Sequence, residues 1–249
     1  MPGRKKLATR VFTMNGSDEN PLGHKVRPPI TLSDRAAAIR YKLRDIVFPK
    51  ALDVIPRYEF EEGVVELRRR VARILDDAEE RPVSFIGIGG ESGSCKTTLA
   101  KELGYPYISL DDYFKVKYRK GDHDRPKGVE FSLLRAHLNL LGNNEPILKP
   151  VYKWEKGAEK RRVPFYPAPV IVVEGLLALD RRIAGAYALR VYMESDRDVA
   201  KKRIVERGVR ERKMEPEYAC VHLEEVVEPL AKIYARNTKR QADIIIFSR

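Results

Sequence analysis

The segment "GGESGSCKTT", residues 89–98, has residue types and a spacing that suit phosphate binding. A phosphate-binding loop consists of a glycine, four residues, a second glycine, and then a lysine and a hydroxyl residue. Gly90, Lys96 and Thr97 are in register, whereas Cys95 stands where the second glycine belongs. In such a loop the backbone N–H groups face phosphate oxygens, the lysine reaches the β- and γ-phosphates, and the hydroxyl ligates Mg²⁺. The predicted nucleotide-binding residues are Gly90, Glu91, Ser92, Gly93, Ser94, Cys95, Lys96, Thr97 and Thr98.

Other interpretations of this loop are weaker. A dinucleotide-binding loop needs a third glycine where Ser92 stands, and an ordinary glycine-rich turn does not explain the lysine and threonine in register. Cys95 is tolerable if its φ and ψ are nearly helical, because glycine is required only at positive φ or where a Cβ would strike the ligand. We therefore expect a working loop. The alternatives are a regulatory thiol whose oxidation blocks phosphate entry, and a loop that has lost activity.

Two acidic motifs follow the loop, each at the end of an apolar run. In "SLDDYF", residues 109–114, Asp111 directly follows a short strand pattern and can act as a general base for a substrate hydroxyl. In "VVEG", Glu174 ends a strand pattern that is apolar throughout, where an unpaired carboxylate is costly. We expect Glu174 to hold Mg²⁺ together with Thr97. The structural alternative for Asp111 is a helix-capping or turn aspartate.

Composition limits the class of protein. The 249 residues carry a net charge of +12, and residues 197–213 form a basic cluster of eight basic and three acidic side chains. Zinc spacing, a recognition helix and a basic stripe interleaved with aromatic residues are all missing, which argues against nucleic acid as the partner. No apolar run is long enough to cross a membrane. Two cysteines make no disulfide framework, so a cytoplasmic setting is the default, and homo-oligomerisation is left open.

Strand and helix patterns alternate from residue 82 onward. Buried strands are expected at 83–90, 107–110, 169–175, 188–194 and 242–247, and helices at 97–103, 131–141 and 197–208. This alternation predicts an α/β fold with a parallel five-stranded sheet that binds ligands at the carboxyl ends of its strands. Residues 146–167 are expected to form a β-hairpin. Residues 1–81 are interpreted as an N-terminal extension, with a polar arm over 1–30 and helices over 34–48 and 61–80 that pack on the core, and 82–249 as the main domain.

The order of these motifs resembles the uridine kinase and phosphoribulokinase family of P-loop kinases over residues 83–247. The phosphate-binding loop, "SLDDYF", "HDRPKGVEF", "KPVY", "FYPAPVIVVEGLLAL" and "NTKRQADIII" occur in the family's order. The resemblance implies a P-loop NTPase fold, ATP and Mg²⁺ as cofactors, and a small-molecule acceptor. Asp111 would be the catalytic base, Asp124 would contact a ribose, and Tyr152 would contact the substrate. The implied acceptor-binding residues are Asp111, Tyr113, Asp124, Arg125 and Tyr152.

The family also has an arginine-rich lid that closes over ATP. Arg203, Arg207, Arg210 and Arg212 occupy the corresponding stretch of this chain. Guanidinium groups clamp phosphates and neutralise charge in the transition state. Arg207 and Arg212 are therefore implied as catalytic with Lys96, and Arg203 and Arg210 as ATP-binding. For any single arginine, a solvated helix face is the structural alternative.

The acceptor is left open between two classes. Uridine kinases carry a histidine shortly after the Pro-Val-Tyr segment, and this chain has "KWEKGAEKRR" there. Arg125 and Lys127 add further positive charge where uridine kinases have a histidine and an aspartate. Uridine or cytidine is the leading acceptor, and a sugar phosphate or another anionic polyol is the main alternative. A nucleotide-binding regulator without turnover and a nucleic-acid-dependent ATPase are the rival classes.

Overall fold

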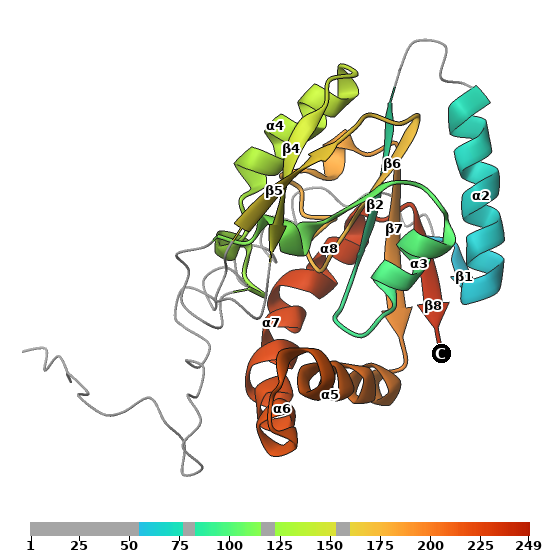
Figure 1. The fold of residues 1–249 in the computed structure, drawn as a ribbon. Helices are drawn as coiled ribbons and strands as arrows, with labels where there is room; N and C mark the ends of the chain where they lie inside the picture. The colour runs from blue at the N-terminus through green and yellow to red at the C-terminus, as the bar shows by residue number, and fades with distance from the viewer. Residues whose placement is uncertain (1–54, 77–82, 116–122, 153–159) are drawn as a thin grey trace, which may run out of the picture.

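The computed structural model describes residues 55–76, 83–115, 123–152 and 160–249. Within them, a six-stranded sheet has the order β1-β8-β7-β2-β6-β3, and every neighbouring pair is parallel (Figure 1). Its strands are β1 (Arg57–Glu59), β2 (Ser84–Gly90), β3 (Tyr107–Ser109), β6 (Val170–Glu174), β7 (Leu189–Ser195) and β8 (Ile244–Ser248). The parallel α/β class predicted from the sequence is confirmed.

The predicted strand count of five is wrong, because β1 adds a sixth strand at the edge beside β8. The β1 sequence "RYE" has three residues and no apolar run, so hydrophobic periodicity does not reveal it. Tyr58 pairs in register with Ile246. This edge strand comes from the segment interpreted as an N-terminal extension.

Helices and tight turns connect the strands on both faces. The α-helices are α2 (Phe60–Asp76), α3 (Lys96–Glu102), α4 (Phe131–Gly142), α5 (Arg197–Arg212), α6 (Pro216–His222), α7 (Glu228–Leu230) and α8 (Arg236–Thr238). Two π-helical turns, Leu223–Val227 and Ala231–Ala235, join α6, α7 and α8 into one continuous run. The 3₁₀ turns are Leu110–Tyr113, Pro126–Gly128, Ala184–Ala186 and Lys239–Gln241.

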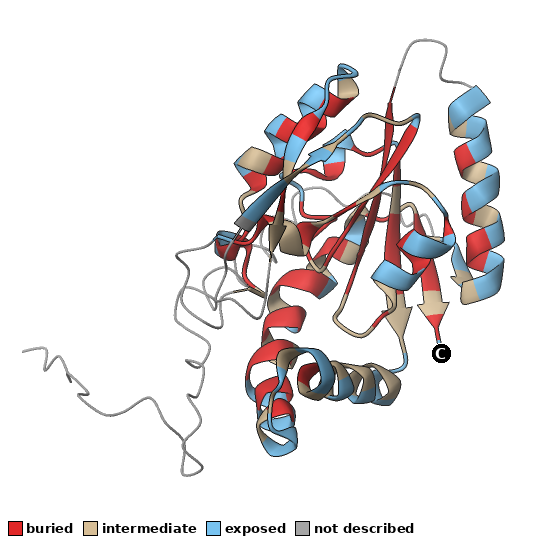
Figure 2. Ribbon diagram, in the orientation of Figure 1, coloured by how far each residue is buried: buried red, intermediate tan, exposed pale blue. Residues whose placement is uncertain are grey.

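The sheet separates two hydrophobic clusters. Its central strands are largely buried (Figure 2). Alternate residues of each strand point to opposite faces, so Ile244 and Ile246 lie in one cluster and Ile245 lies in the other. Helices α2 and α3 cover the first face. Helices α4, α7 and the neighbouring π turns cover the second. This two-sided burial explains why the central strands are almost wholly apolar.

Helix α2 contributes directly to the first cluster. Its residues Val64, Leu67 and Val71 fall at spacings of three and four and are buried, while Val65 is exposed. They lie in the same cluster as Ile244 and Ile246 of β8. The structure therefore places residues 57–76 within the folded core. The expected arm over 1–30 and helix over 34–48 lie outside the described residues.

A β-hairpin lies apart from the main sheet, as the sequence predicted. Strand β4 (Ile147–Tyr152) pairs antiparallel with β5 (Lys160–Phe165), and Ile147 is opposite Phe165. The hairpin lies next to α4 and the 3₁₀ turn Leu110–Tyr113 (Figure 1). In the described part of the chain, no helix is long and apolar enough to cross a membrane.

Candidate active site

The phosphate-binding loop joins β2 to α3, as its spacing predicted. The carbonyl of Glu91 is the centre of its hydrogen bonds: it accepts one from Lys96 Nζ at 2.6 Å and one from the Ser94 hydroxyl at 2.8 Å. Gly93 has φ +81°, and a Cβ there would lie 2.6 Å from the carbonyl oxygen of Ala200 in α5. Glycine is thus required at this position both by the backbone conformation and by the close approach of α5.

Cys95 does not have the nearly helical backbone that would let a cysteine replace glycine at little cost. Its φ and ψ are 64° and 27°, in the left-handed region that favours glycine. The cysteine is therefore strained by about 1–2 kcal/mol, the cost of placing an L-residue in this region. The loop is nevertheless intact, because α3 begins at Lys96 directly after this residue.

Side chains from distant elements hold the loop. Arg236 of α8 makes two hydrogen bonds to the carboxylate of Glu91, at 2.8 and 3.0 Å. Arg203 of α5 donates to the Gly93 carbonyl and to the Ser248 hydroxyl, both at 3.2 Å. The predicted ATP-binding residues Glu91 and Arg203 thus make structural contacts around the loop. Thr97 and Thr98 are exposed on the first turn of α3.

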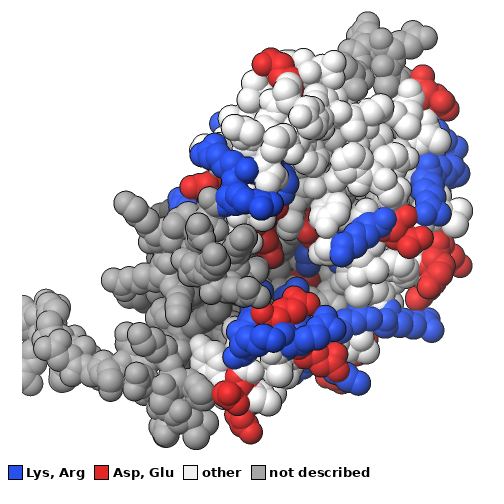
Figure 3. All heavy atoms as spheres, in the orientation of Figure 1, with Lys and Arg blue, Asp and Glu red and all other residues white. Residues whose placement is uncertain are grey.

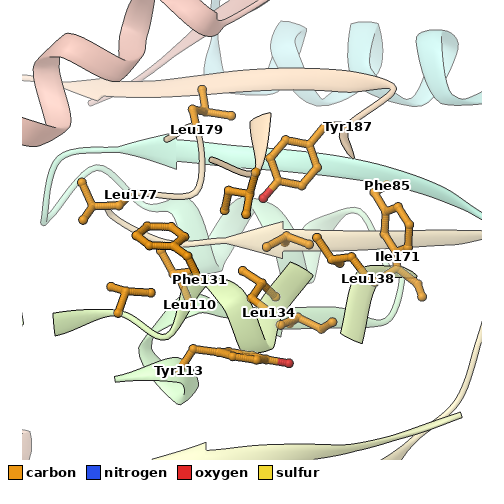
Figure 4. Close-up of a cluster of buried hydrophobic side chains, with 14 of the residues drawn as sticks. Phe85, Leu110, Tyr113, Phe131, Leu134, Leu138, Ile171, Leu177, Leu179 and Tyr187 are labelled. Carbon is orange, nitrogen blue, oxygen red and sulfur yellow. The ribbon is translucent and has the colours of Figure 1, made fainter. Parts of the chain in front are cut away.

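Asp111 lies in a 3₁₀ turn that is firmly anchored in the core. Leu110 and Tyr113, on either side of it, are almost fully buried and pack with Phe131 and Leu134 of α4 (Figure 4). Burial raises the pKa of Asp111 above its ordinary value. Arg212 and Arg207 of α5 and then Lys96 of α3 oppose that rise, and Asp112 adds to it. A carboxylate at the carboxyl end of β3 is thus close to cations from two other elements.

Glu174 ends β6 beside the loop and is 4% exposed. Burial raises the pKa of its carboxyl group, as does the nearby Asp111, whereas Lys96 and hydrogen bonds with the hydroxyl groups of Ser109 and Thr97 lower it. Burial also lowers the pKa of Lys96 to about 8, although Glu174 and Asp111 oppose this change. Lys96, Thr97, Asp111 and Glu174 thus form one group at the carboxyl ends of β2, β3 and β6.

The four arginines predicted as a lid divide into two pairs. Arg207 and Arg212 line a cavity of about 30 Å³ together with Ser92 of the loop and Asp124. Arg210 lies on the outer face of α5, where it pairs with Glu211 at 3.0 Å, and Arg203 holds the loop as described. Figure 3 shows basic side chains gathered over α5 in the lower part of the view, beside a hollow in which acidic side chains are visible. Of these four arginines, therefore, only Arg207 and Arg212 lie near Asp111.

An aromatic cluster made of Phe114, His123 and Tyr152 lies next to the turn that carries Asp111. The His123 Nε2 and Tyr152 hydroxyl are 2.9 Å apart. The ring of Phe114 makes edge contacts with both, with centroids at 4.8 Å to His123 and 5.8 Å to Tyr152. The three residues come from three segments, and the hairpin strand β4 supplies Tyr152.

Two predicted acceptor-binding residues are buried. Tyr113 is fully buried, and its hydroxyl is 2.8 Å from Nδ1 of His137 in the core. Arg125 is 1% exposed. Four further residues with contacts in or beside the site were not predicted from the sequence: His123, Asp112, Lys149 and Arg236. The position of His123 directly before Asp124 could have indicated its place in the site. The contact between Arg236 and Glu91 could not be predicted, because the two residues are 145 positions apart.

The parallel sheet, the loop between β2 and α3 and the basic helix beyond β7 define a P-loop kinase. Solved structures agree with this fold. YFH7 from Saccharomyces cerevisiae, a proposed P-loop kinase with a circular permutation, is 10% identical with a TM-score of 0.58, over 75% of this chain and 99% of that one. A proposed fructose transport system kinase from Silicibacter is 18% identical with a TM-score of 0.57, over 72% and 97%. At these identities the likeness shows the fold alone.

The chain belongs to the phosphoribulokinase and uridine kinase family, whose model matches residues 104–249. The uridine kinase of Halobacterium salinarum is 36% identical over 180 residues, which cover 66% of this chain and 80% of that relative. The protein is accordingly an ATP-dependent kinase that transfers a phosphate group to a hydroxyl of a small molecule.

Proposed function

We propose that the acceptor is a pyrimidine nucleoside, uridine or cytidine. The observation that carries this proposal is the aromatic cluster of Phe114, His123 and Tyr152 beside the base Asp111. Flat rings suit the faces of a heteroaromatic base, and an imidazole adds a hydrogen-bonding group that can recognise its edge. The sequence lacks a histidine after the Pro-Val-Tyr segment, and His123 brings an imidazole to Tyr152 from another segment. Relatives at 32–36% identity are uridine kinases.

Lys149 and Arg125 do not form an open site for an anionic acceptor, whereas Lys127 is exposed. Lys149 is ion-paired with Asp112, and both side chains are largely buried. Arg125 is buried as well. The side chains of Lys149 and Arg125 are therefore not available to bind an anionic group of the acceptor. A sugar phosphate, the alternative acceptor, gains little from them.

In the proposed mechanism, a nucleoside hydroxyl attacks the γ-phosphorus of ATP in line with the bond to the β–γ bridging oxygen. Asp111 accepts the hydroxyl proton, the bond to the bridging oxygen breaks, and ADP leaves. Lys96, Arg207 and Arg212 neutralise the charge that develops on the phosphate oxygens, and Asp124 binds the ribose. The remaining predicted ATP contacts, Arg203 and Arg210, would need to leave the partners that they have here.

The residues at the loop fit Mg²⁺. The Thr97 hydroxyl is close enough to the Glu174 carboxyl group to lower its pKa, and the two groups supply the oxygen ligands that Mg²⁺ prefers. The described residues contain no cluster of three acidic, histidine or cysteine side chains that could hold a metal. Mg²⁺ usually needs only one or two protein ligands when substrate phosphates supply the others. When bound, the ion would neutralise phosphate charge. We place the reaction in the cytoplasm, as the two free cysteines suggest.

The test is ADP formation with ATP, Mg²⁺ and separate acceptors: uridine, cytidine, a pentose and a pentose phosphate. We expect turnover with the two nucleosides and loss of about 10²–10⁴-fold in kcat in Asp111→Asn, the usual contribution of a general base. Asp198→Asn, on the exposed face of α5, is the control and should retain activity. Turnover only with the pentose phosphate would overturn the acceptor assignment. Full activity of Asp111→Asn would overturn the assignment of the base.

A further inference from the structure

Asp112, the neighbour of the base, connects two parts of the candidate site. One carboxylate oxygen pairs with Lys149 Nζ, and the other accepts a hydrogen bond from the backbone N–H of Tyr152 at 3.0 Å. Both contacts cross from the 3₁₀ turn Leu110–Tyr113 to strand β4 of the hairpin. We propose that Asp112 is a positioning residue that fixes the hairpin, and with it Tyr152, relative to Asp111.

The two connected parts differ in how firmly they are held. The turn is anchored by Leu110 and Tyr113, which are 2% and 0% exposed (Figure 4). Among the described residues the hairpin pairs with no strand of the main sheet, and an isolated two-stranded hairpin is only marginally stable in water. One end is held by Ile147, which is buried in the core with Phe165 packed against it. Towards the other end of β4, Asp112 contacts Lys149 and the backbone of Tyr152.

The charges at this connection are sheltered. The side chains of Lys149 and Asp112 are 12% and 16% exposed. A buried ion pair gives little net stability but is costly to break on one side, because the remaining charge stays buried without compensation. Removing either partner should thus move the hairpin more than removing both.

A displaced hairpin would act on the acceptor rather than on ATP. Tyr152 contacts His123 and Phe114 through its side chain while its N–H is held by Asp112. The phosphate-binding loop is held by other contacts, from Arg203 and Arg236. This inference rests on the proposed function insofar as Tyr152 binds a nucleoside.

The first test is a double-mutant cycle with Asp112→Asn, Lys149→Met and the double variant, with uridine as acceptor. We expect each single variant to raise the KM for uridine by about tenfold, within the range of coupling between contacting residues, and to leave the KM for ATP unchanged. The double variant should be no worse than either single one. Additive effects would overturn the proposal, because Lys149 would then act on the substrate independently. Equal increases in both KM values, or no change, would also overturn it.

A second measurement separates this proposal from the proposed function. If the wild type does not phosphorylate uridine, the acceptor assignment fails, and amide hydrogen exchange of the free protein decides the role of Asp112. The Tyr152 N–H should exchange at least tenfold faster in Asp112→Ala, while amides of the main sheet, such as that of Val172, keep their protection. Unchanged exchange at Tyr152 would overturn the proposal, as would an equal loss of protection throughout the sheet.

Discussion

Cys95 has a backbone conformation that suits glycine, at the start of the helix that follows the phosphate-binding loop. Glycine would remove about 1–2 kcal/mol of backbone strain from the folded state. Part of this gain in stability is offset because glycine also raises the conformational entropy of the unfolded chain. Cys95→Gly should therefore raise the melting temperature by about 1–4 °C and keep kinase activity. Cys220→Gly, at an exposed position of α6, is the matched control and should lower the melting temperature, since glycine weakens a helix. Destabilisation in Cys95→Gly would show that the loop tolerates the cysteine without strain.

The regulatory-thiol interpretation is tested on the same variant. If oxidation of Cys95 blocks phosphate entry, the wild type and Cys220→Gly should lose activity on treatment with hydrogen peroxide, and Cys95→Gly should not. Dithiothreitol should restore the wild type. Equal responses in all three proteins would reject the interpretation.

The pKa values of Asp111 and Lys96 predict a bell-shaped pH dependence. Burial raises the pKa of Asp111, and only the ionised carboxylate can accept a proton, so activity should fall as the pH drops through that raised value. Burial lowers the pKa of Lys96 to about 8, so kcat/KM for ATP should fall as the pH rises through that value. Arg212→Met removes the cation that most lowers the pKa of Asp111. It should move the acidic limb of the kcat/KM profile to higher pH, and a shift to lower pH would contradict the arrangement.

At the residue scale, sequence reasoning located the groups that lie at strand ends. Lys96, Thr97, Asp111 and Glu174 follow recognisable spacings and buried runs, and the structure brings them together. Contacts between distant segments have no such pattern. The pairing of Glu91 with Arg236 and the pairing of Asp112 with Lys149 depend on how helices and the hairpin pack, and could not be predicted.

At the element scale, the helical run from α6 to α8 supports the phosphate-binding loop through Arg236. Because the Glu91 carbonyl accepts a hydrogen bond from Lys96, loss of the Arg236 contact should disturb the position of that lysine. Arg236→Ala should raise the KM for ATP several-fold and leave the KM of the acceptor unchanged. The exposed Lys232→Ala is the matched control. Equal KM values in the two variants would show that the ion pair does not position the loop.

Five strands and the hairpin were predictable because their residues are apolar or flanked by turn residues. The sixth strand and the run from α6 to α8 were not predicted. Pro229 lies inside that run, where proline normally ends a helix, and the π turns on either side keep it continuous. Tertiary packing of Val226, Leu230 and Tyr234 in the core stabilises what local preference does not.

At the scale of the whole molecule, residues 57–76 complete one side of the sheet. Strand β1 forms the edge beside β8, and α2 covers the adjoining face. Leu67 is fully buried and lies in one cluster with β2, β6, β7 and β8. Leu67→Ala should lower the free energy of unfolding by about 2–5 kcal/mol, as for other buried leucines. Val65→Ala, on the exposed face of the same helix, should change it by less than about 0.5 kcal/mol. Chemical denaturation measures both. A small effect of Leu67→Ala would mean that this segment is an appendage to the kinase domain.

The central claim is that the phosphate loop, Asp111 and the aromatic cluster together phosphorylate a pyrimidine nucleoside. Its most direct test is product analysis by mass spectrometry after incubation of the wild type with ATP, Mg²⁺ and uridine. We predict ADP and uridine monophosphate in a one-to-one ratio, and formation of both products about 10²–10⁴-fold slower in Asp111→Asn. ADP without a phosphorylated nucleoside, or phosphate transfer confined to a pentose phosphate in a parallel incubation, would contradict the account.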